Sequence, residues 1–225
     1  MARTIKTWRD PYDAGFSTTR PREITINPGV TILVGCNGAG KTTLINNIQE
    51  ELNKNQIPYM KFNNLTDGHT HAADAAMYRG EMALTATILT SSEGENILNS
   101  LSSTISHAAN FIKTGKSSMR YTRRQNDDYT PPNERWFFFD AIDSGSSIDN
   151  IIDLKAIFPL MQNTADSCGV DLYIIISANS YEMACGENCF DVMSGKYISF
   201  NSYDEYKKFI LKTRTKKEKR YAKQQ

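Results

Sequence analysis

Apolar runs of strand length alternate along the chain with segments that favour helices. Four short runs rich in β-branched or aromatic residues predict buried strands: residues 30–34, 59–62, 136–139 and 172–176. Helical spacing of apolar residues, or a run of helix formers, marks four further segments: residues 44–52, 82–89, 97–105 and 151–161. Because strands alternate with helices, the pattern predicts an α/β fold whose core sheet is mainly parallel.

Two segments depart from this alternation. Residues 113–135 are polar, contain two consecutive prolines and show no period, so we expect a long loop or insertion there. Near the end of the chain, the apolar segments 189–192 and 197–200 flank Ser194-Gly195, which is typical of a β-hairpin. The sheet is therefore expected to carry antiparallel strands and a terminal hairpin beside its parallel core.

Charge is unevenly distributed along the chain. The formal net charge is +1, but residues 207–225 hold nine Lys/Arg and one Glu, a balance of +8 that leaves −7 for residues 1–206. The sequence therefore predicts a folded domain, residues 1–206, and a basic C-terminal helix or tail, residues 207–225, that continues a helix starting near Ser202. This tail is either a solvated, disordered segment or a contact for nucleic-acid phosphates.

Composition narrows the class of protein. A chain of 225 residues, 40% of them hydrophobic, fits one domain with a sizeable core. No apolar run approaches the roughly 18 residues that a membrane span needs, and the first ten residues lack the apolar stretch of a signal peptide. We therefore expect a cytoplasmic protein without membrane contact and with its four cysteines as free thiols.

A glycine-rich motif follows the first predicted strand. The sequence GCNGAGKTT satisfies the P-loop pattern, with a strand before it and a helix after it. Its glycines let backbone N–H groups face phosphate oxygens, Lys41 neutralises the β- and γ-phosphates, and the Thr42 hydroxyl reaches Mg²⁺. The motif predicts ATP and Mg²⁺ as ligands and the following binding residues: Gly35, Cys36, Asn37, Gly38, Ala39, Gly40, Lys41, Thr42 and Thr43.

Three features together resemble the ABC-type ATPases. The P-loop has their GxNGxGKTT form, residues 136–149 (WFFFDAIDSGSSID) resemble their Walker B strand with its D-loop, and FDVMSGKYISF resembles their closing hairpin. The resemblance implies an ABC-type nucleotide-binding domain over residues 1–206. It also implies that Asp140 is the metal-side aspartate and Asp149 the D-loop aspartate.

The segment SSEGE, which precedes the predicted helix at 97–105, resembles the ABC signature. Ser92 and Gly94 match the family's serine and second glycine, whereas Glu93 departs from its first glycine. A serine and open N–H groups at a helix start can bind an anion. In the family this motif touches the γ-phosphate held by the partner subunit, so the resemblance implies a nucleotide-dependent, head-to-tail homodimer. A plain N-capped helix is the alternative interpretation.

The pattern departs from the family at the residues for hydrolysis. Ala141 stands where the family has the glutamate that positions or activates the attacking water, and alanine cannot accept a proton. Asn179 lies where the family has its switch histidine, and it can still hydrogen-bond a γ-phosphate. Asp143 is the nearest spare carboxylate, and it either replaces the base or caps the loop. The candidate catalytic residues are therefore Lys41 and Asp143.

These features predict an ABC-type ATP-binding protein that works as a Mg-ATP-dependent dimer switch with slow or defective hydrolysis. Two alternatives stay open: a competent ATPase in DNA metabolism that uses Asp143 or a partner group as base, and a pseudo-ATPase whose nucleotide is structural. The weak signature counts against a transporter subunit, and the D-loop and hairpin count against a small-molecule kinase. Residues 42–91 are too few for a coiled-coil arm, so the chain resembles a bare SMC-like or RecF-like head and small ATP-binding proteins of phages.

Overall fold

The computed structural model describes residues 2–7, 23–63, 107–116, 130, 132–144 and 146–222. The candidate signature at Ser92 and Gly94 and the helical segments expected at 82–89 and 97–105 lie outside the described residues. So does the middle of the insertion expected at about 113–135. At its two ends, the helical residues 107–114 and the strand that begins at Glu134 each extend into the expected insertion.

The core is a six-stranded sheet with the order β4-β5-β6-β3-β7-β8. Its strands are β3 (Gly29–Val34), β4 (Tyr59–Asn63), β5 (Glu134–Asp140), β6 (Asp171–Ser177), β7 (Cys189–Asp191) and β8 (Lys196–Ile198). The first five run parallel to one another, and β8 pairs antiparallel with β7 as the second strand of a hairpin. The predicted mainly parallel α/β sheet and its terminal hairpin are therefore confirmed.

Strand β5 starts two residues earlier than its apolar run. Glu134 and Arg135 are polar, yet they pair with Asp171 and Leu172 of β6. Arg135 is buried because its guanidinium donates to backbone carbonyls, among them that of Phe111 at 3.2 Å, which satisfies the charged group inside the protein. A strand that contains such a residue cannot be delimited from hydrophobicity alone.

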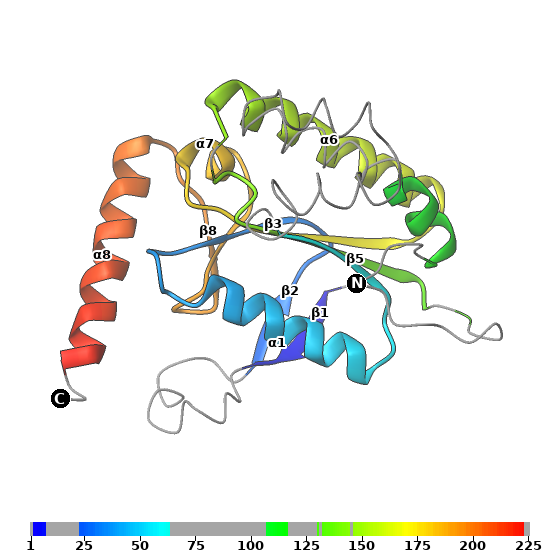
Figure 1. The fold of residues 1–225 in the computed structure, drawn as a ribbon, viewed down its shortest axis with the longest axis horizontal. Coiled ribbons are helices and arrows are strands. Elements are labelled where there is room, and N and C mark those ends of the chain that lie inside the picture. Colours follow the sequence, from blue (N-terminus) through cyan, green and yellow to red (C-terminus); the bar gives the residue numbers. More distant parts are fainter. Residues whose placement is uncertain are drawn as a thin grey trace, which may run out of the picture.

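Helices cover both faces of the sheet (Figure 1). One face packs against α1 (Lys41–Lys54) and the antiparallel pair β1 (Arg3–Lys6) and β2 (Glu23–Ile26). The other face packs against α6 (Ile148–Ser167), the short α7 (Tyr181–Ala184) and the helical residues 107–114. Burial on both faces is the usual arrangement of a parallel sheet and explains why its strands are continuously apolar.

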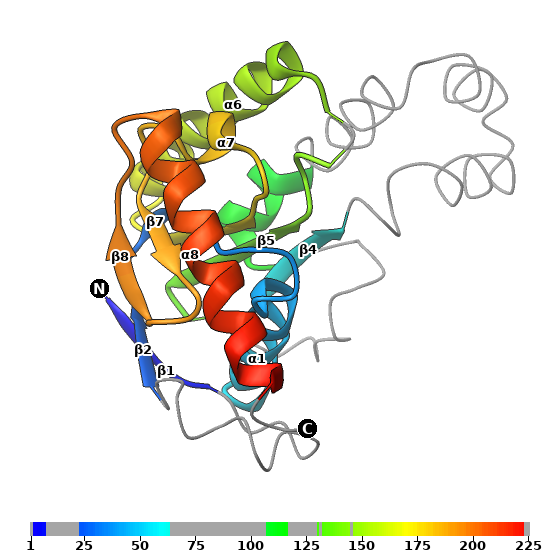
Figure 2. The same ribbon diagram turned by 90° about the vertical axis from the view of Figure 1, so that its left-hand side faces the viewer.

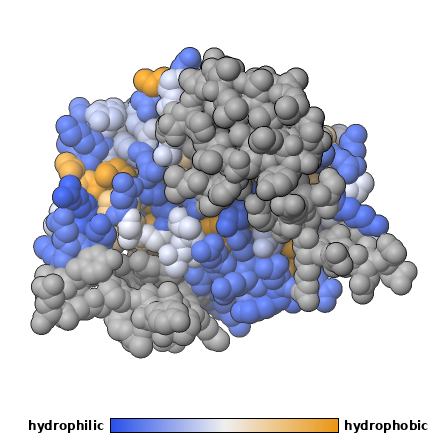
Figure 3. Space-filling view, viewed as in Figure 1, coloured by the Kyte–Doolittle hydropathy of each residue, from blue (hydrophilic) through white to orange (hydrophobic). Residues whose placement is uncertain are grey.

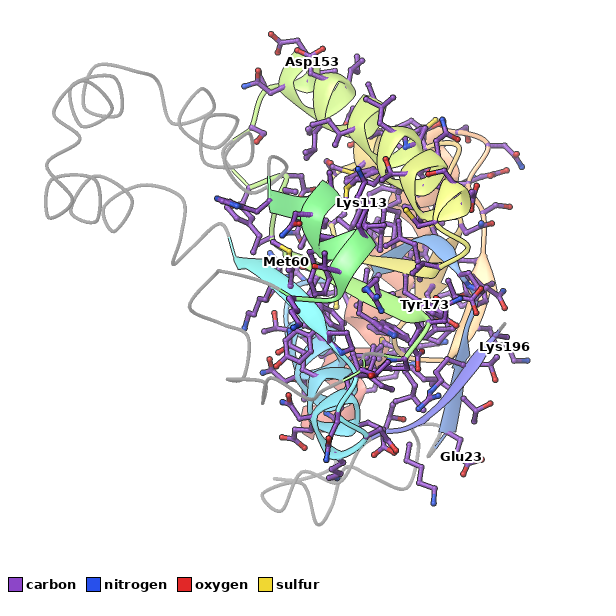
Figure 4. The ribbon with its side chains drawn as sticks, turned by 90° about the vertical axis from the view of Figure 1, so that its right-hand side faces the viewer. Glu23, Met60, Lys113, Asp153, Tyr173 and Lys196 are labelled. Carbon is purple, nitrogen blue, oxygen red and sulfur yellow. The ribbon has the colours of Figure 1, made fainter. Side chains whose placement is uncertain are left out.

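Strand β5 shows how the two faces form. Trp136 and Phe138 belong to the cluster on the α1 side, whereas Phe137 and Phe139 belong to the cluster on the α6 side, because successive side chains of a strand alternate. Trp136 stacks on Tyr173 of β6 with ring centroids 4.0 Å apart. Tyr173, which is labelled in Figure 4 among the core side chains, is thereby buried on the α1 side of the sheet.

The last helix, α8 (Tyr203–Ala222), lies across the end of the sheet where α1 begins. Figure 2 looks onto this end and shows α8 crossing in front of the strands from α7 to α1. Tyr206 and Thr213 are buried, and Phe209 and Ile210 pack against the core clusters. The division drawn at residue 207 therefore marks a change in charge within one continuous helix and not the end of an element.

The described residues on the face shown in Figure 3 are mainly hydrophilic. Within the described part of the chain, no helix combines the length and the apolar character that crossing a membrane requires.

Candidate functional site: the phosphate loop and its neighbours

The loop between β3 and α1 has the geometry of a phosphate cradle. Gly35 cannot be replaced without displacement, because a Cβ there would lie 2.9 Å from the Cβ of Ala39. Gly40 has a φ of 100°, a conformation that side chains disfavour, and it is the N-cap of α1 without a side-chain cap. These glycines let the backbone turn directly from the strand into the helix.

The start of α1 presents free backbone donors. The first helical hydrogen bond runs from the Leu44 N–H to the Gly40 carbonyl over 2.9 Å. The N–H groups of Lys41, Thr42 and Thr43 precede it and therefore have no carbonyl partner within the helix. Together with the positive end of the helix dipole, they give this end of α1 the properties of an anion-binding site, at the carboxyl end of the sheet where ligands of open α/β sheets bind.

Lys41 is the first residue of α1, and its side chain is buried, with only 8% of the residue exposed. Its Nζ donates to the Gly35 carbonyl over 2.9 Å, which folds the side chain back over the loop. Burial lowers the pKa of Lys41 below its ordinary value of 10.5, while the negative charges of Asp143 and Asp140 act in the opposite direction. An anion bound in the cradle would therefore stabilise the charged form of a lysine that burial disfavours.

Thr42 and Asp140, the two predicted metal ligands, lie in direct contact. The Thr42 Oγ1 donates to Asp140 Oδ1 over 3.2 Å, although the residues are 98 positions apart in the chain. Hydroxyl and carboxylate oxygens are the ligands that Mg²⁺ prefers, so this pair fits a magnesium site at the edge of the cradle. Among the described residues, no group of three or more His, Cys, Asp or Glu side chains forms a metal site of another kind.

Ser177 joins this pair and is a residue that the sequence did not single out. The sheet order places β6 between the P-loop strand β3 and the Asp140 strand β5. Ser177 ends β6, and its hydroxyl donates to Asp140 Oδ1 and accepts the Ala141 N–H over 2.8 Å. A polar residue at the end of an otherwise apolar strand was the available signal, because carboxyl ends of neighbouring parallel strands meet at one edge.

Ala141 follows Asp140 with a positive φ of 54°. Non-glycine residues seldom adopt this conformation, and when they do it is often at a functional site. Its N–H is committed to Ser177, and its methyl group supplies no hydrogen-bonding atom. The first residue after the Asp140 strand therefore offers no side-chain group to a water molecule.

Asp143 is buried and holds the loop that follows β6. Its Oδ2 accepts the N–H of Asn179 over 2.7 Å and the N–H of Ser180 over 2.6 Å. Its Oδ1 is buried and has no hydrogen-bond partner among the described residues. The geometry favours loop anchoring, one of the two interpretations that the sequence left open for this carboxylate.

Asn179 lies on the same loop. The residue is exposed, its N–H donates to Asp143, and its carbonyl accepts the hydroxyl of Tyr206 over 2.9 Å. Asn179 is thus an exposed residue at the carboxyl end of β6, and its backbone is fixed by Asp143 and by Tyr206 of α8.

Helix α8 reaches the P-loop itself. The Thr213 Oγ1 accepts the N–H of Cys36 over 3.1 Å, and Lys217 Nζ donates to the Asn37 carbonyl over 2.8 Å. The sequence pattern predicted only a basic helix or tail here and did not predict the contact of α8 with the P-loop. The available signal was the spacing of Tyr206, Thr213 and Lys217, which places them along one face of a helix.

The four cysteines are free thiols, as predicted. Cys36 and Cys189 are buried, and burial raises the pKa of Cys189 to about 12, whereas Cys168 and Cys185 are exposed.

Comparison with known families agrees with this geometry. Residues 22–141 match the KAP family P-loop domain, which is more than half of the 225 residues. The matched segment contains the whole P-loop and the strand that carries Asp140. A comparison with curated proteins gives no match to the chain. The chain therefore belongs to the KAP family of P-loop NTPases, a class whose phosphate loop binds nucleotides.

Proposed function

We propose that this protein is an ABC-like, Mg-ATP-binding switch that hydrolyses ATP slowly. The observation that carries the proposal is Ala141, whose side chain cannot accept a proton and whose N–H is held by Ser177 at 2.8 Å. In the ABC-type ATPases that the sequence resembles, a glutamate at this position positions or activates the attacking water. Without it, a water at the γ-phosphate lacks the group that would orient it, and phosphoryl transfer depends mainly on such positioning.

The state of Asp143 supports slow turnover. A base must accept a proton, yet Asp143 Oδ2 already accepts two backbone N–H groups, from Asn179 and Ser180, which leaves only the buried Oδ1 for a proton. Protonation would weaken both contacts and loosen the loop after β6. This observation weighs against the alternative of a competent ATPase that uses Asp143 as base.

Binding of the nucleotide is assigned to the cradle and the Thr42–Asp140 pair. The N–H groups at the start of α1 and the Lys41 amine would hold the phosphates, and Thr42 and Asp140 would hold Mg²⁺. The bound metal ion would offset negative charge on the phosphate oxygens. Asn179 is the exposed candidate for a polar contact to the terminal phosphate.

A nucleotide-dependent homodimer is the second part of the proposal. Ile148 and Ile152, on the first turns of α6 beside the D-loop-like Asp149, are 59% and 60% exposed. Residues four positions apart lie on one face of a helix, so the pair forms an apolar spot that a partner subunit would cover. In this arrangement Ser92 and Gly94 of one subunit would contact the nucleotide of the other.

Three measurements on the purified protein test the proposal. Calorimetry should detect Mg-ATP binding that Lys41→Ala abolishes and that Lys54→Ala, which removes an exposed lysine of the same helix, leaves intact. Light scattering should show dimers with ATP and monomers with ADP, and Ser92→Arg should prevent dimerisation while preserving binding. Phosphate release should be slow. Unchanged affinity in Lys41→Ala would refute nucleotide binding at this loop, and monomers in saturating ATP would refute the dimer.

A further inference from the structure

A lysine of the C-terminal helix lies against the middle of the P-loop. Lys217 Nζ donates to the Asn37 carbonyl over 2.8 Å, and it lies 3.4 Å from the point that a Cβ on Gly38 would occupy. Asn37 and Gly38 are residues of the loop whose backbone wraps the phosphates of a nucleotide. The amine thus lies close to the backbone of the P-loop at Asn37 and Gly38.

The helix that carries Lys217 is fixed at two other points, which set the position of the amine. Thr213, four residues earlier on the same face, is 1% exposed and accepts the Cys36 N–H over 3.1 Å. Tyr206 is also buried, and its hydroxyl donates to the Asn179 carbonyl. Tyr206 and Lys217 are 11 residues apart, about 16 Å along a helix. Helix α8 therefore connects the loop after β6 to the P-loop.

The charge of Lys217 is not neutralised in the described part of the chain. Its hydrogen-bond acceptor is a carbonyl, which carries no net charge. The neighbouring acid on the helix, Glu218, pairs with Arg214 over 2.9 Å. A lysine amine on a flexible four-carbon stem can leave a carbonyl for a stronger, charged acceptor with little movement of the helix.

From these observations we propose that Lys217 is a second phosphate-binding cation, which α8 supplies to the nucleotide held by the P-loop. This inference rests on the proposed nucleotide site. On binding, the amine exchanges the Asn37 carbonyl for a phosphate oxygen, while Thr213 keeps the helix in place. The basic end of the chain is then part of the nucleotide site, and its lysines at other helical positions stay in solvent.

The test compares charge-removing and charge-keeping variants by calorimetry with Mg-ATP. Lys217→Gln should weaken binding about tenfold, equivalent to about 1.4 kcal/mol, and should flatten the salt dependence of the affinity. Lys217→Arg should restore most of the affinity. Lys216→Ala, which removes an exposed lysine one position away, should bind like the natural chain.

Unchanged affinity in Lys217→Gln, with Lys41→Ala still abolishing binding, would overturn the role of Lys217 and leave the nucleotide site intact. Tighter binding in Lys217→Gln would also overturn it, because the Asn37 contact would then be inhibitory. If the natural chain itself fails to bind Mg-ATP, the proposed function fails and not only this inference. Thermal unfolding separates a packing role from a phosphate contact, since a packing role lowers the midpoint of Lys217→Gln without changing the ATP affinity.

Discussion

Replacing Ala141 by glutamate should raise the rate of ATP hydrolysis about tenfold, a change of roughly 1.4 kcal/mol in the barrier. The substitution puts a carboxylate on the residue that follows Asp140, at the carboxyl end of the sheet beside the P-loop. It makes no new demand on the backbone, because alanine already adopts the positive φ of 54° there and both residues carry a Cβ. The Ala141 N–H can keep its hydrogen bond to Ser177.

The expected size of the gain follows from what the side chain can supply. A well-placed general base contributes about 10²–10⁴ in rate. A residue introduced without its supporting contacts will be less well oriented, and an error of about 1 Å in placement can cost about a hundredfold. Dividing the first figure by the second gives a gain of about 1- to 100-fold, and about tenfold is the middle of this range.

The assay is steady-state phosphate release at saturating Mg-ATP, with calorimetry to verify that affinity is unchanged. Ala141→Gln is the matched control, because it has the same size as glutamate but cannot take up a proton at neutral pH. Only Ala141→Glu should gain activity if the missing group is a base. An equal gain in both variants would indicate that orientation of water by a polar group is sufficient.

The variant Asp143→Asn distinguishes two cases: either the protein has no general base, or Asp143 acts as the base in place of the missing glutamate. If the natural chain hydrolyses ATP briskly, if Ala141→Glu is no faster, and if Asp143→Asn is inactive while still binding ATP, then Asp143 acts as the base and the reasoning from Ala141 is refuted.

Four further predictions concern Lys41, Ser177 and Ala141 at the same site. The pKa of Lys41 is lowered below 10.5 in the folded protein, so between the lowered value and 10.5 the unfolded chain binds more protons than the folded one. The free energy of unfolding, measured by urea titration, should therefore rise with pH in that window. The rise should be lost in Lys41→Met. In the same window, ATP affinity should fall with rising pH, because phosphate favours the charged amine. Ser177→Ala should cost about 1–3 kcal/mol in urea unfolding, because the Ala141 N–H loses its acceptor; no loss would mean that water replaces the hydroxyl. Ala141→Gly should stabilise the protein by about 0.5–1 kcal/mol, because relief of the left-handed conformation exceeds the entropy cost of glycine; a lower melting midpoint would contradict this.

The P-loop could be predicted from the sequence because every requirement for it is local. The apolar strand, the glycines and the helix follow one another within 26 residues, from Gly29 to Lys54, and the structure reproduces them in that order. The strand ending in Asp140 was equally clear from its aromatic run. The meeting of Thr42 and Asp140 follows once both strands are parallel, because their carboxyl ends share one edge.

The remaining parts of the site depend on contacts between residues far apart in the chain. The order of strands places β6 between β3 and β5, and only that order gives Ser177 its contact with Asp140. The two roles considered for Asp143 differ only in what its oxygens touch, and the Asn179 and Ser180 N–H groups are 36 and 37 residues away. Sequence patterns show which residues are apolar or charged, but they do not show from which distant backbone N–H group a carboxylate will accept a hydrogen bond.

Helix α8 shows this limit most clearly. Its charge balance is evident from the sequence, and that balance alone favours a solvated tail. Thr213 and Lys217 contact P-loop residues 177 and 180 positions earlier, and such contacts exist only in the folded structure, where α8 packs against the core. The sequence by itself therefore determined the chemistry of the phosphate cradle, whereas the tertiary structure decided that a basic helix lies beside it, because packing of the apolar stripe on α8 outweighs the solvation of its charged faces.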